Sequence, residues 1–319
     1  SDATNGWIPL DDDVAADEPV VPPTQKGIFG FGTTGGSNRL SMTNLVNSSG
    51  VVASDVTGVG TARRQLAATG YGLDKAIFAY GDTASSVVSM SNLVSNSGVV
   101  ASDVTGVGSA RQAPGAAVYG GDKAIFGYGY TTGYVSLTNL VNSSGVIATD
   151  TTGVGLARYT LGAAGYGGDK AIFGFGAASS PELVSVTNLV TNVGVVGTDV
   201  TGVGTARMQI AASGYGGDKA IFGYGYLGSD NVTNLSNLVS NTGVVASDTS
   251  GVGTSRTDLS STEYGGDKAI FGYGNSNTAS TTPSTISNLV SNVGVIASDV
   301  SGVGTARYSI TAAGYSSSA

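Results

Sequence analysis

One aspartate and one arginine, eight residues apart, recur six times along this 319-residue chain. Such a ring of charges could bind a cation through its acids or an anion through its arginines. A repeated pair also makes a charge-assisted hydrogen bond that holds a turn or ties repeated units together. Because the pair is the same in every copy, we expect it to be architectural. The pairs are Asp55 and Arg63, Asp103 and Arg111, Asp150 and Arg158, Asp199 and Arg207, Asp248 and Arg256, and Asp299 and Arg307.

Two further polar positions recur with the same period, an asparagine eleven residues before each aspartate and a tyrosine eight residues after each arginine. The asparagines could line a ligand groove, but we expect each to bond to nearby backbone, as asparagine does around strands and turns. The tyrosines could stack on sugars, but we expect them to pack between repeated units with the hydroxyl satisfied locally. The asparagines are Asn44, Asn92, Asn139, Asn188, Asn237 and Asn288, and the tyrosines are Tyr71, Tyr119, Tyr166, Tyr215, Tyr264 and Tyr315.

The composition contains few of the residue types that usually act in catalysis. The chain has no Cys and no His, so it lacks thiolate metal ligands, disulfides and the commonest general base. Serine is abundant but has no histidine to activate it. Carboxylate-only chemistry needs two acids at special positions, and the acids outside the repeat pattern are Asp82, Glu182, Asp230, Asp258 and Glu263. We therefore predict a non-enzymatic protein without cofactor or metal.

Charge and hydropathy exclude two classes of partner. The net charge is −8, and the six acids of residues 1–25 are accompanied by no Lys or Arg. No basic stripe is present to bind a phosphate backbone, so we expect no nucleic acid. No apolar run approaches the roughly 20 residues that cross a bilayer, so we expect no membrane insertion. The N-terminus also lacks the pattern of a signal peptide, which predicts cytoplasmic synthesis.

These positions belong to a repeat of 47 to 49 residues, whose length varies only in one segment of ten to fourteen residues per copy. Each copy contains four short β-rich stretches separated by turn residues. In one copy these are residues 123–128, 135–141, 145–149 and 159–166. No stretch has the apolar spacing of an amphipathic helix. The pattern predicts an all-β chain with one four-stranded unit per repeat.

Six such units over residues 26–319 predict a six-bladed β-propeller of four-stranded blades. The last stretch of each copy is rich in Ala and Gly, which suits an innermost strand where space tapers. Pro22 and Pro23 precede the first copy and cannot supply an inner strand. We therefore predict that the C-terminal strand, residues 308–315, completes the blade formed by residues 26–60 and closes the ring.

The motif Arg-x-x-Leu-Ala-Ala-x-Gly-Tyr-Gly followed by Asp-Lys-Ala-Ile-Phe-Gly-Tyr-Gly resembles the kelch repeat, and the likeness covers residues 26–319. Two features depart from it: the glycine doublet is split (Gly127 and Gly129), and the outer-strand Trp is missing. The barely diverged, cysteine-poor copies are also similar to kelch-like arrays in virion proteins of tailed bacteriophages. The resemblance implies a structural or receptor-binding role without catalysis.

The variable segments are the candidate binding face, because all six would emerge on one face of a propeller. They hold aromatic and polar side chains suited to stacking on sugars or bonding to polar protein surfaces. Variation without function is the alternative. The candidate residues are Asn38, Arg39, Asp82, Tyr130, Tyr134, Glu182, Tyr226, Asp230, Asn231, Asn275 and Asn277.

Residues 1–25 form an acidic extended tail with two short apolar clusters, of which the first contains Trp7, Ile8 and Leu10. Such a segment can dock on a partner and fold there, or it can be a solvated leader. We first expect a non-enzymatic decoration or fibre protein on a virion or extracellular surface, attached to another structural protein through this tail. The alternatives are a lectin-like module that binds host glycans through the variable face, and a kelch-type interaction adaptor.

Overall fold

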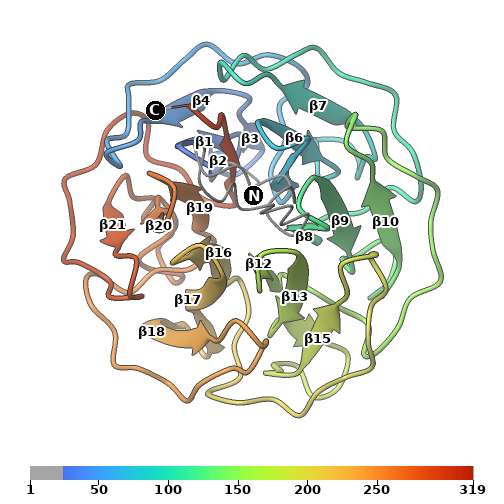
Figure 1. The fold of residues 1–319 in the computed structure, drawn as a ribbon. Coiled ribbons are helices and arrows are strands. Elements are labelled where there is room, and N and C mark those ends of the chain that lie inside the picture. Colours follow the sequence, from blue (N-terminus) through green and yellow to red (C-terminus); the bar gives the residue numbers. More distant parts are fainter. Residues whose placement is uncertain (1–23, 319) are drawn as a thin grey trace, which may run out of the picture.

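The computed structural model describes residues 24–318, which form only β-structure, with no helix among them. Six three-stranded antiparallel sheets repeat along the chain and lie around a common centre (Figure 1). Two small two-stranded sheets, β2–β3 and β11–β14, involve the variable segments. The predicted all-β class is confirmed, whereas the predicted docking residues Trp7, Ile8 and Leu10 lie outside the described residues.

Each sheet has an inner, a middle and an outer strand. The inner strands are β5 (Ala67–Tyr71), β8 (Gly115–Tyr119), β12 (Gly162–Tyr166), β16 (Ala211–Tyr215), β19 (Ser260–Tyr264) and β22 (Thr311–Tyr315). The middle strands are β1 (Lys26–Gly30), β6 (Lys75–Ala79), β9 (Lys123–Gly127), β13 (Lys170–Gly174), β17 (Lys219–Gly228) and β20 (Lys268–Gly272). The outer strands are β4 (Thr43–Val46), β7 (Ser91–Val94), β10 (Thr138–Val141), β15 (Thr187–Val190), β18 (Asn231–Val239) and β21 (Ser287–Val290). The remaining strands are β2 (Thr33–Gly35), β3 (Asn38–Arg39), β11 (Arg158–Tyr159) and β14 (Ala177–Ala178).

The middle strand of each sheet supplies the core. Its Ala-Ile-Phe run, which is Gly27-Ile28-Phe29 in β1, is buried on both faces, which is why it is apolar without alternation. The phenylalanine lies against the preceding sheet at a position where that sheet has a small residue. A Cβ on Gly127, for example, would come within 2.8 Å of the Phe173 ring. Small residues in one sheet and a large ring in the next therefore interlock neighbouring sheets.

The third of the four stretches predicted in each copy does not form a regular strand, so the sheets are three-stranded. Residues 145–149 follow β10 but join it only through isolated bridges, such as Val141 with Ile147. The carbonyl of Ala148 accepts a hydrogen bond at 3.0 Å from the side-chain amide of Asn139. In a regular β-ladder this carbonyl would accept from a backbone N–H of the neighbouring strand. Here the Asn139 side chain donates to it instead, and the backbone pairing between the two segments is interrupted.

The C-terminal strand pairs with the first one, as the sequence predicts. β22 lies antiparallel to β1 with Lys26 opposite Tyr315 and Gly30 opposite Thr311. Each inner strand also contacts the next, from β5 through β8, β12, β16 and β19 to β22, and β22 contacts β5. The inner strands therefore touch one another in an unbroken series.

Two sets of backbone hydrogen bonds reinforce this series, one at each end of the inner strands. Near the hairpins the bonds run from Gly72 to Asp122, Gly120 to Asp169, Gly167 to Asp218, Gly216 to Asp267, Gly265 to Gln25 and Ser316 to Asp74. At the opposite end each bond joins residues that lie two positions before an inner strand. These bonds run from Gln65 to Ser309, Ala113 to Gln65, Thr160 to Ala113, Gln209 to Thr160, Asp258 to Gln209 and Ser309 to Asp258. All six residues of the second set have positive φ, between 49° and 54°, a conformation unfavourable for non-glycine residues.

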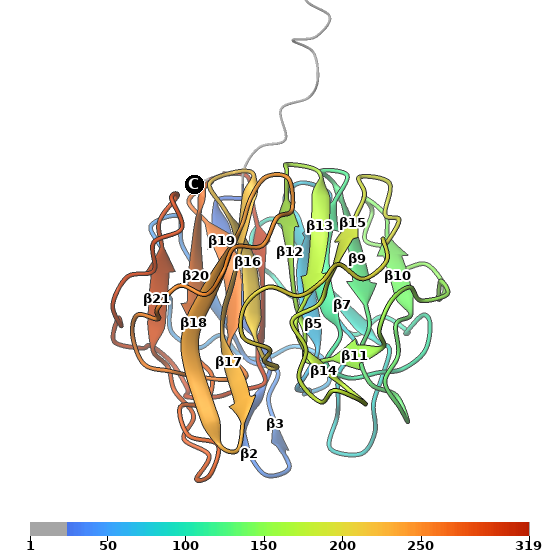
Figure 2. The same ribbon diagram turned by 90° about the horizontal axis from the view of Figure 1, so that it is seen from below.

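The two ends of the structure differ in what they carry (Figure 2). The end that we call the hairpin end holds the tight turns between inner and middle strands. It also holds Thr24 and Gln25, whose carbonyls accept hydrogen bonds from Gly266 and Gly265 at 2.9 and 3.0 Å. The opposite end, the loop end, carries the variable segments, including β2–β3 and the tip of β17–β18.

Candidate functional site

The structure divides most of the predicted binding-face residues into three separate groups at the loop end. The first group joins Arg39 to Asp82, the second joins Tyr130 to Tyr134, and the third joins Tyr226 to Asp230. They are not brought together in one site, because each variable segment contacts mainly itself and its neighbouring segment.

The first group is an ion-pair cluster between the first two copies. Asp82 Oδ2 accepts from Arg39 Nη2 at 2.8 Å and from Arg64 Nε at 3.0 Å. Arg39 also donates from Nη1 to the Gly36 carbonyl at 2.8 Å, and only 9% of its side chain is exposed. A carboxylate that already accepts from two guanidinium groups holds two loops together rather than moving protons. Asn38 belongs to the same hairpin and donates to Thr34 Oγ1 at 2.7 Å.

The second group is an aromatic cluster. The rings of Tyr130, Tyr134 and Tyr159 meet with centroids 5.4 to 5.6 Å apart, and all three residues are half-buried. Burial raises the pKa of Tyr159, with a smaller contribution in the same direction from Tyr134 and Glu182. Tyr159 is a residue that the sequence analysis missed, although the position after the repeated arginine varies among the copies and Tyr159 could have been noticed there.

The third group stabilises the loops of the last two copies. Asp230 donates its backbone N–H to Tyr226 Oη at 3.1 Å, and its carboxylate accepts from Thr278 at 3.3 Å. Asn231 donates to the Ser229 carbonyl at 3.1 Å. Asn275 and Asn277 likewise accept hydrogen bonds from backbone groups of their own loop. Most of these predicted binding residues therefore shape the loops that carry them.

Each repeated arginine reaches the aspartate of the following copy and not the one eight residues before it, so the charges tie repeated units together, which is one of the two architectural roles expected for them. Arg63, Arg158 and Arg256 reach Asp103, Asp199 and Asp299 through Asn92, Asn188 and Asn288, which accept from the arginine and donate to the aspartate. Ion pairs of 3.7 to 3.8 Å join Arg111 to Asp150, Arg207 to Asp248, and Arg307 to Asp55. The last of these joins the final copy to the first. Sequence spacing alone could not identify the partner, because the aspartate that each arginine meets is not the one nearest to it along the chain.

Arg207 illustrates how each arginine is held. It is fully buried and donates to Asn237 Oδ1 at 2.6 Å and to the carbonyl of Tyr224 at 2.8 Å. Its guanidinium lies 4.4 Å from the ring centroid of Phe175, a cation–π contact. Burial lowers the pKa of Arg207 to about 10, which leaves it charged at neutral pH.

The aspartate and the asparagine belong to the same hydrogen-bonded cluster. We call this cluster an arginine node, and here it consists of Arg207, Asn237 and Asp248. Asp248 accepts from Thr205 Oγ1 at 2.6 Å and from Asn237 Nδ2 at 2.9 Å. Partial burial acts to raise the pKa of Asp248, but these hydrogen bonds outweigh it and lower the pKa below its usual value. Asn237 also donates to the Ala246 carbonyl at 3.0 Å, as predicted for the asparagines. Because all six arginines and all six asparagines have no exposed surface, they are closed to a ligand from solvent.

The aromatic residues beneath the arginines are another feature that sequence reasoning missed. They follow the middle strands, are buried and have positive φ between 62° and 65°. They are Phe31, Tyr80, Tyr128, Phe175, Tyr224 and Tyr273.

The repeated tyrosines are also buried, and Tyr71, for example, covers Gly145, where a Cβ would come within 2.8 Å of its ring. Their predicted packing between units is thus confirmed.

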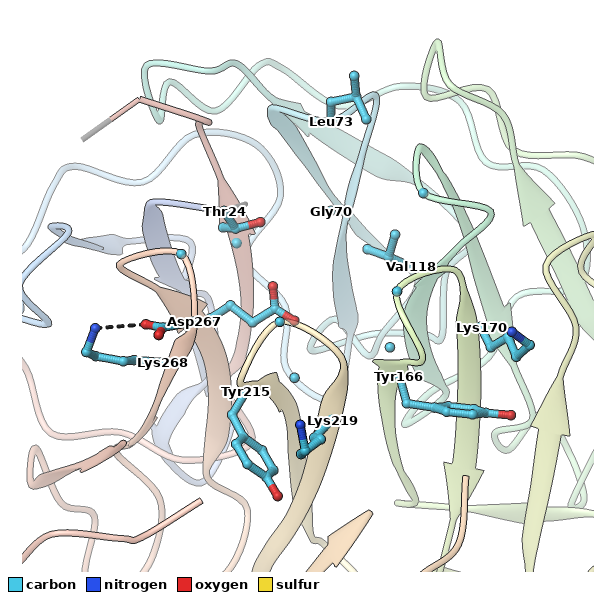
Figure 3. A pocket seen from close by; sticks show the side chains of 18 of the residues that line it. Thr24, Gly70, Leu73, Val118, Tyr166, Lys170, Tyr215, Lys219, Asp267 and Lys268 are labelled. Atoms are coloured by element: carbon cyan, nitrogen blue, oxygen red, sulfur yellow. Dashed lines mark hydrogen bonds and ion pairs between the residues drawn. The ribbon is translucent and has the colours of Figure 1, made fainter. Parts of the chain in front are cut away.

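A cavity of about 320 Å³ opens at the centre of the hairpin end (Figure 3). Residues from all six inner strands line it together with Thr24, and a narrower cavity of about 80 Å³ continues between the same strands. Lysines surround its mouth, each paired with the aspartate before it, as for Lys268 and Asp267 at 2.8 Å. Glu263 is the one acid of the wall outside these pairs, and burial raises its pKa.

Acids outside the repeat do not assemble into the two-carboxylate site considered from the sequence. Asp82 and Asp230 belong to the first and third groups, and Glu182 lies beside Tyr159 in the second. Within residues 24–318 no three His, Cys, Asp or Glu side chains gather where they could hold a metal ion. The same residues include no helix of the length and hydropathy that a bilayer crossing requires.

No protein-family model matches this chain, and a search of curated proteins also returned no match. The resemblance to kelch-like repeats and to phage virion proteins therefore stays a prediction.

Proposed function

We propose that this protein is a non-enzymatic display protein, built as a six-bladed β-propeller, that is attached to a larger assembly at its hairpin end and presents the loop end outward. The observation that carries the proposal is the opposition of the two ends. The chain enters the sheets through Thr24 at the hairpin end, and the variable segments lie at the other (Figure 2).

Several contacts support the propeller. Pairing of β22 with β1, the contact of β22 with β5, and the ion pair between Arg307 and Asp55 all join the last copy to the first. Two further links of the same kind are backbone hydrogen bonds, from Gln65 to Ser309 and from Ser316 to Asp74. A chain whose ends are joined in this way has no unpaired inner edge where another β-strand could add.

The position of Thr24 and Gln25 supports attachment through residues 1–25. Hydrogen bonds from Gly265 and Gly266 hold both residues at the hairpin end, so the preceding segment starts there. An assembly bound through Trp7, Ile8 and Leu10 would therefore leave the loop end free. We infer that the assembly is a virion or another extracellular surface and that the partner is a structural protein.

This attachment can be tested in the virus or cell that encodes the chain. A tagged full-length copy is expected in sedimented particles, and a tagged copy lacking residues 1–23 is expected to be lost from them. A copy in which residues 130–134 are exchanged for the corresponding loop of another repeat is the matched control, and it should be incorporated normally. Equal incorporation of the truncated copy would refute attachment through the tail, provided that both purified proteins melt at the same temperature.

Recognition of a glycan at the loop end is a second candidate function, favoured by the cluster of Tyr130, Tyr134 and Tyr159. Half-buried aromatic rings are pre-ordered and amphipathic, which suits them to the apolar face of a sugar. Binding on a glycan array that disappears in Tyr134→Ala but persists in Tyr226→Ala would support it. A blank array with and without calcium would remove this candidate and leave the display role.

A further inference from the structure

The inner strand β19 differs chemically from the other five inner strands. At the position of Ser261 the other copies have alanine, namely Ala68, Ala116, Ala163, Ala212 and Ala312. At the position of Glu263 they have small or apolar residues, namely Gly70, Val118, Gly165, Gly214 and Gly314. One strand thus carries a hydroxyl and a carboxyl where the rest of the array has neither.

Both side chains belong to the wall of the central cavity. Glu263 lines the wider part at the hairpin end and the narrower continuation, and Ser261 lines the continuation. Ser261 is only 6% exposed, and its Oγ has no hydrogen-bond partner. A buried hydroxyl without a partner is costly, so it marks a position where a bound group can supply one.

Glu263 is a carboxyl without a cationic partner. It lies against Gly214, where any Cβ would collide with Oε1, so the glycine makes room for it. The Gly214 backbone acts to lower the pKa of Glu263, but burial outweighs it and raises the pKa. The lysines at the mouth are already engaged, since Lys75, Lys219 and Lys268 each contact the neighbouring aspartate at 2.5 to 2.8 Å.

The other side of the cavity is mostly apolar. Val118 projects from β8, and the remaining inner strands contribute glycines and alanines together with Thr69 and Ser213. A volume of about 320 Å³ falls within the range of small-molecule sites. The cavity therefore combines one acidic side with apolar walls, which is a complement to a molecule that has a cationic head and a short hydrocarbon body.

We propose that the central cavity binds a small organic ammonium ion, with its ammonium group on Glu263 and Ser261 and its hydrocarbon body against Val118 and the alanines. A metal ion fits less well, because it needs several oxygen ligands and the wall supplies only one carboxylate outside the lysine pairs. The site lies at the hairpin end, where attachment is also proposed, but the binding test uses the isolated protein and its outcome does not depend on that attachment.

The test is isothermal titration of the full-length protein with n-butylammonium chloride at pH 7.5 and constant ionic strength. Saturable binding is expected, with no binding of butyrate. Glu263→Gln keeps the shape of the side chain and removes its charge, and Glu263→Gly installs the residue of four other copies. Both should weaken binding by about tenfold or more, because they remove a charge-assisted hydrogen bond. Ser261→Ala should weaken it less, and Glu182→Gln, at the loop end, should not change it.

Three outcomes would overturn the proposal. The first is the absence of saturable n-butylammonium binding to the unaltered protein. The second is equal binding by Glu263→Gln, when thermal melting shows that this variant is folded. The third is binding of calcium chloride, lost in Glu263→Gln, in the absence of any binding of n-butylammonium, which would make the cavity a metal site.

Discussion

Replacing Arg207 by Met tests whether the buried arginine nodes hold the array together. Methionine keeps the unbranched apolar stem over Phe175 and removes the guanidinium. The change breaks the hydrogen bonds to Asn237 and Tyr224 and the 3.7 Å ion pair with Asp248. Asn237 Oδ1 is then left buried without its donor, and Asp248 loses its cation.

The expected loss follows from these contacts. Removing one partner of a buried charge pair costs about 3–5 kcal/mol of unfolding free energy. The unfolding entropy is about 2.1 cal/mol/K per residue, which amounts to roughly 0.6 kcal/mol/K for a chain of this size. A loss of about 4 kcal/mol should therefore lower the melting temperature by about 6 °C.

Circular dichroism during thermal and urea denaturation at pH 7 measures both quantities. Lys219→Met is the matched control, because it removes a cation whose side chain is 42% exposed and paired at the surface. That change should cost less than about 1 kcal/mol. Arg307→Met should cost as much as Arg207→Met, because Asn44 and Asp55 hold Arg307 in the same way. If Arg207→Met were as stable as Lys219→Met, the nodes would not be what ties the copies together.

Three further predictions concern pH, close packing and the terminal strand. Burial raises the pKa of Asp258 to about 6 from 3.8, so the folded protein holds this proton more tightly than the unfolded chain. The contribution of Asp258 to the free energy of unfolding should therefore fall by up to about 3 kcal/mol as the pH rises from about 4 to about 6. Comparing the urea-denaturation profiles of the unaltered protein and Asp258→Asn isolates this contribution from that of carboxyls whose pKa is lowered, such as Asp248. Gly145 has a φ of 80°, and a Cβ added there would lie 2.8 Å from the Tyr71 ring. Gly145→Ala should therefore lower the free energy of unfolding by about 2 kcal/mol or more in the same assay. Gly133→Ala is the control and should be nearly neutral, because a Cβ added at Gly133 meets no atom within 4 Å. Deleting residues 310–319 removes the partner of the first strand and should abolish the cooperative thermal transition; a full-height transition in the truncated chain would contradict the pairing of the chain ends.

Much of the architecture could be predicted because it depends on local composition. Ala-Ile-Phe runs with β-branched and aromatic residues indicate buried strands, and Gly-Gly-Asp turns indicate the hairpins that join them. The pairing of β22 with β1 was predictable as well, because the first copy has no inner strand upstream of Lys26 and the last copy has one left over.

Less of the candidate site could be predicted. The cluster of Arg39, Arg64 and Asp82 joins two copies, and Tyr159 meets Tyr130 and Tyr134 from outside their segment. The predicted outer strand failed for a related reason, since the amide of Asn139 bonds to Ala148 from a neighbouring strand. In each case the contact joins two segments, and the sequence of neither segment specifies that the other lies next to it.

The sequence by itself determined the repeat, the all-β class, the strand that joins the two ends of the chain, and the one segment per copy that is free to vary. These follow from periodicity and side-chain volume, which act within a copy. Only the tertiary structure decided that Arg207 meets Asp248 instead of Asp199, and that Glu263 and Ser261 line one central cavity. The physical reason is that charges and cavities depend on which side chains approach in space, and the acid nearest to Arg207 along the chain is not the acid that approaches it in the fold.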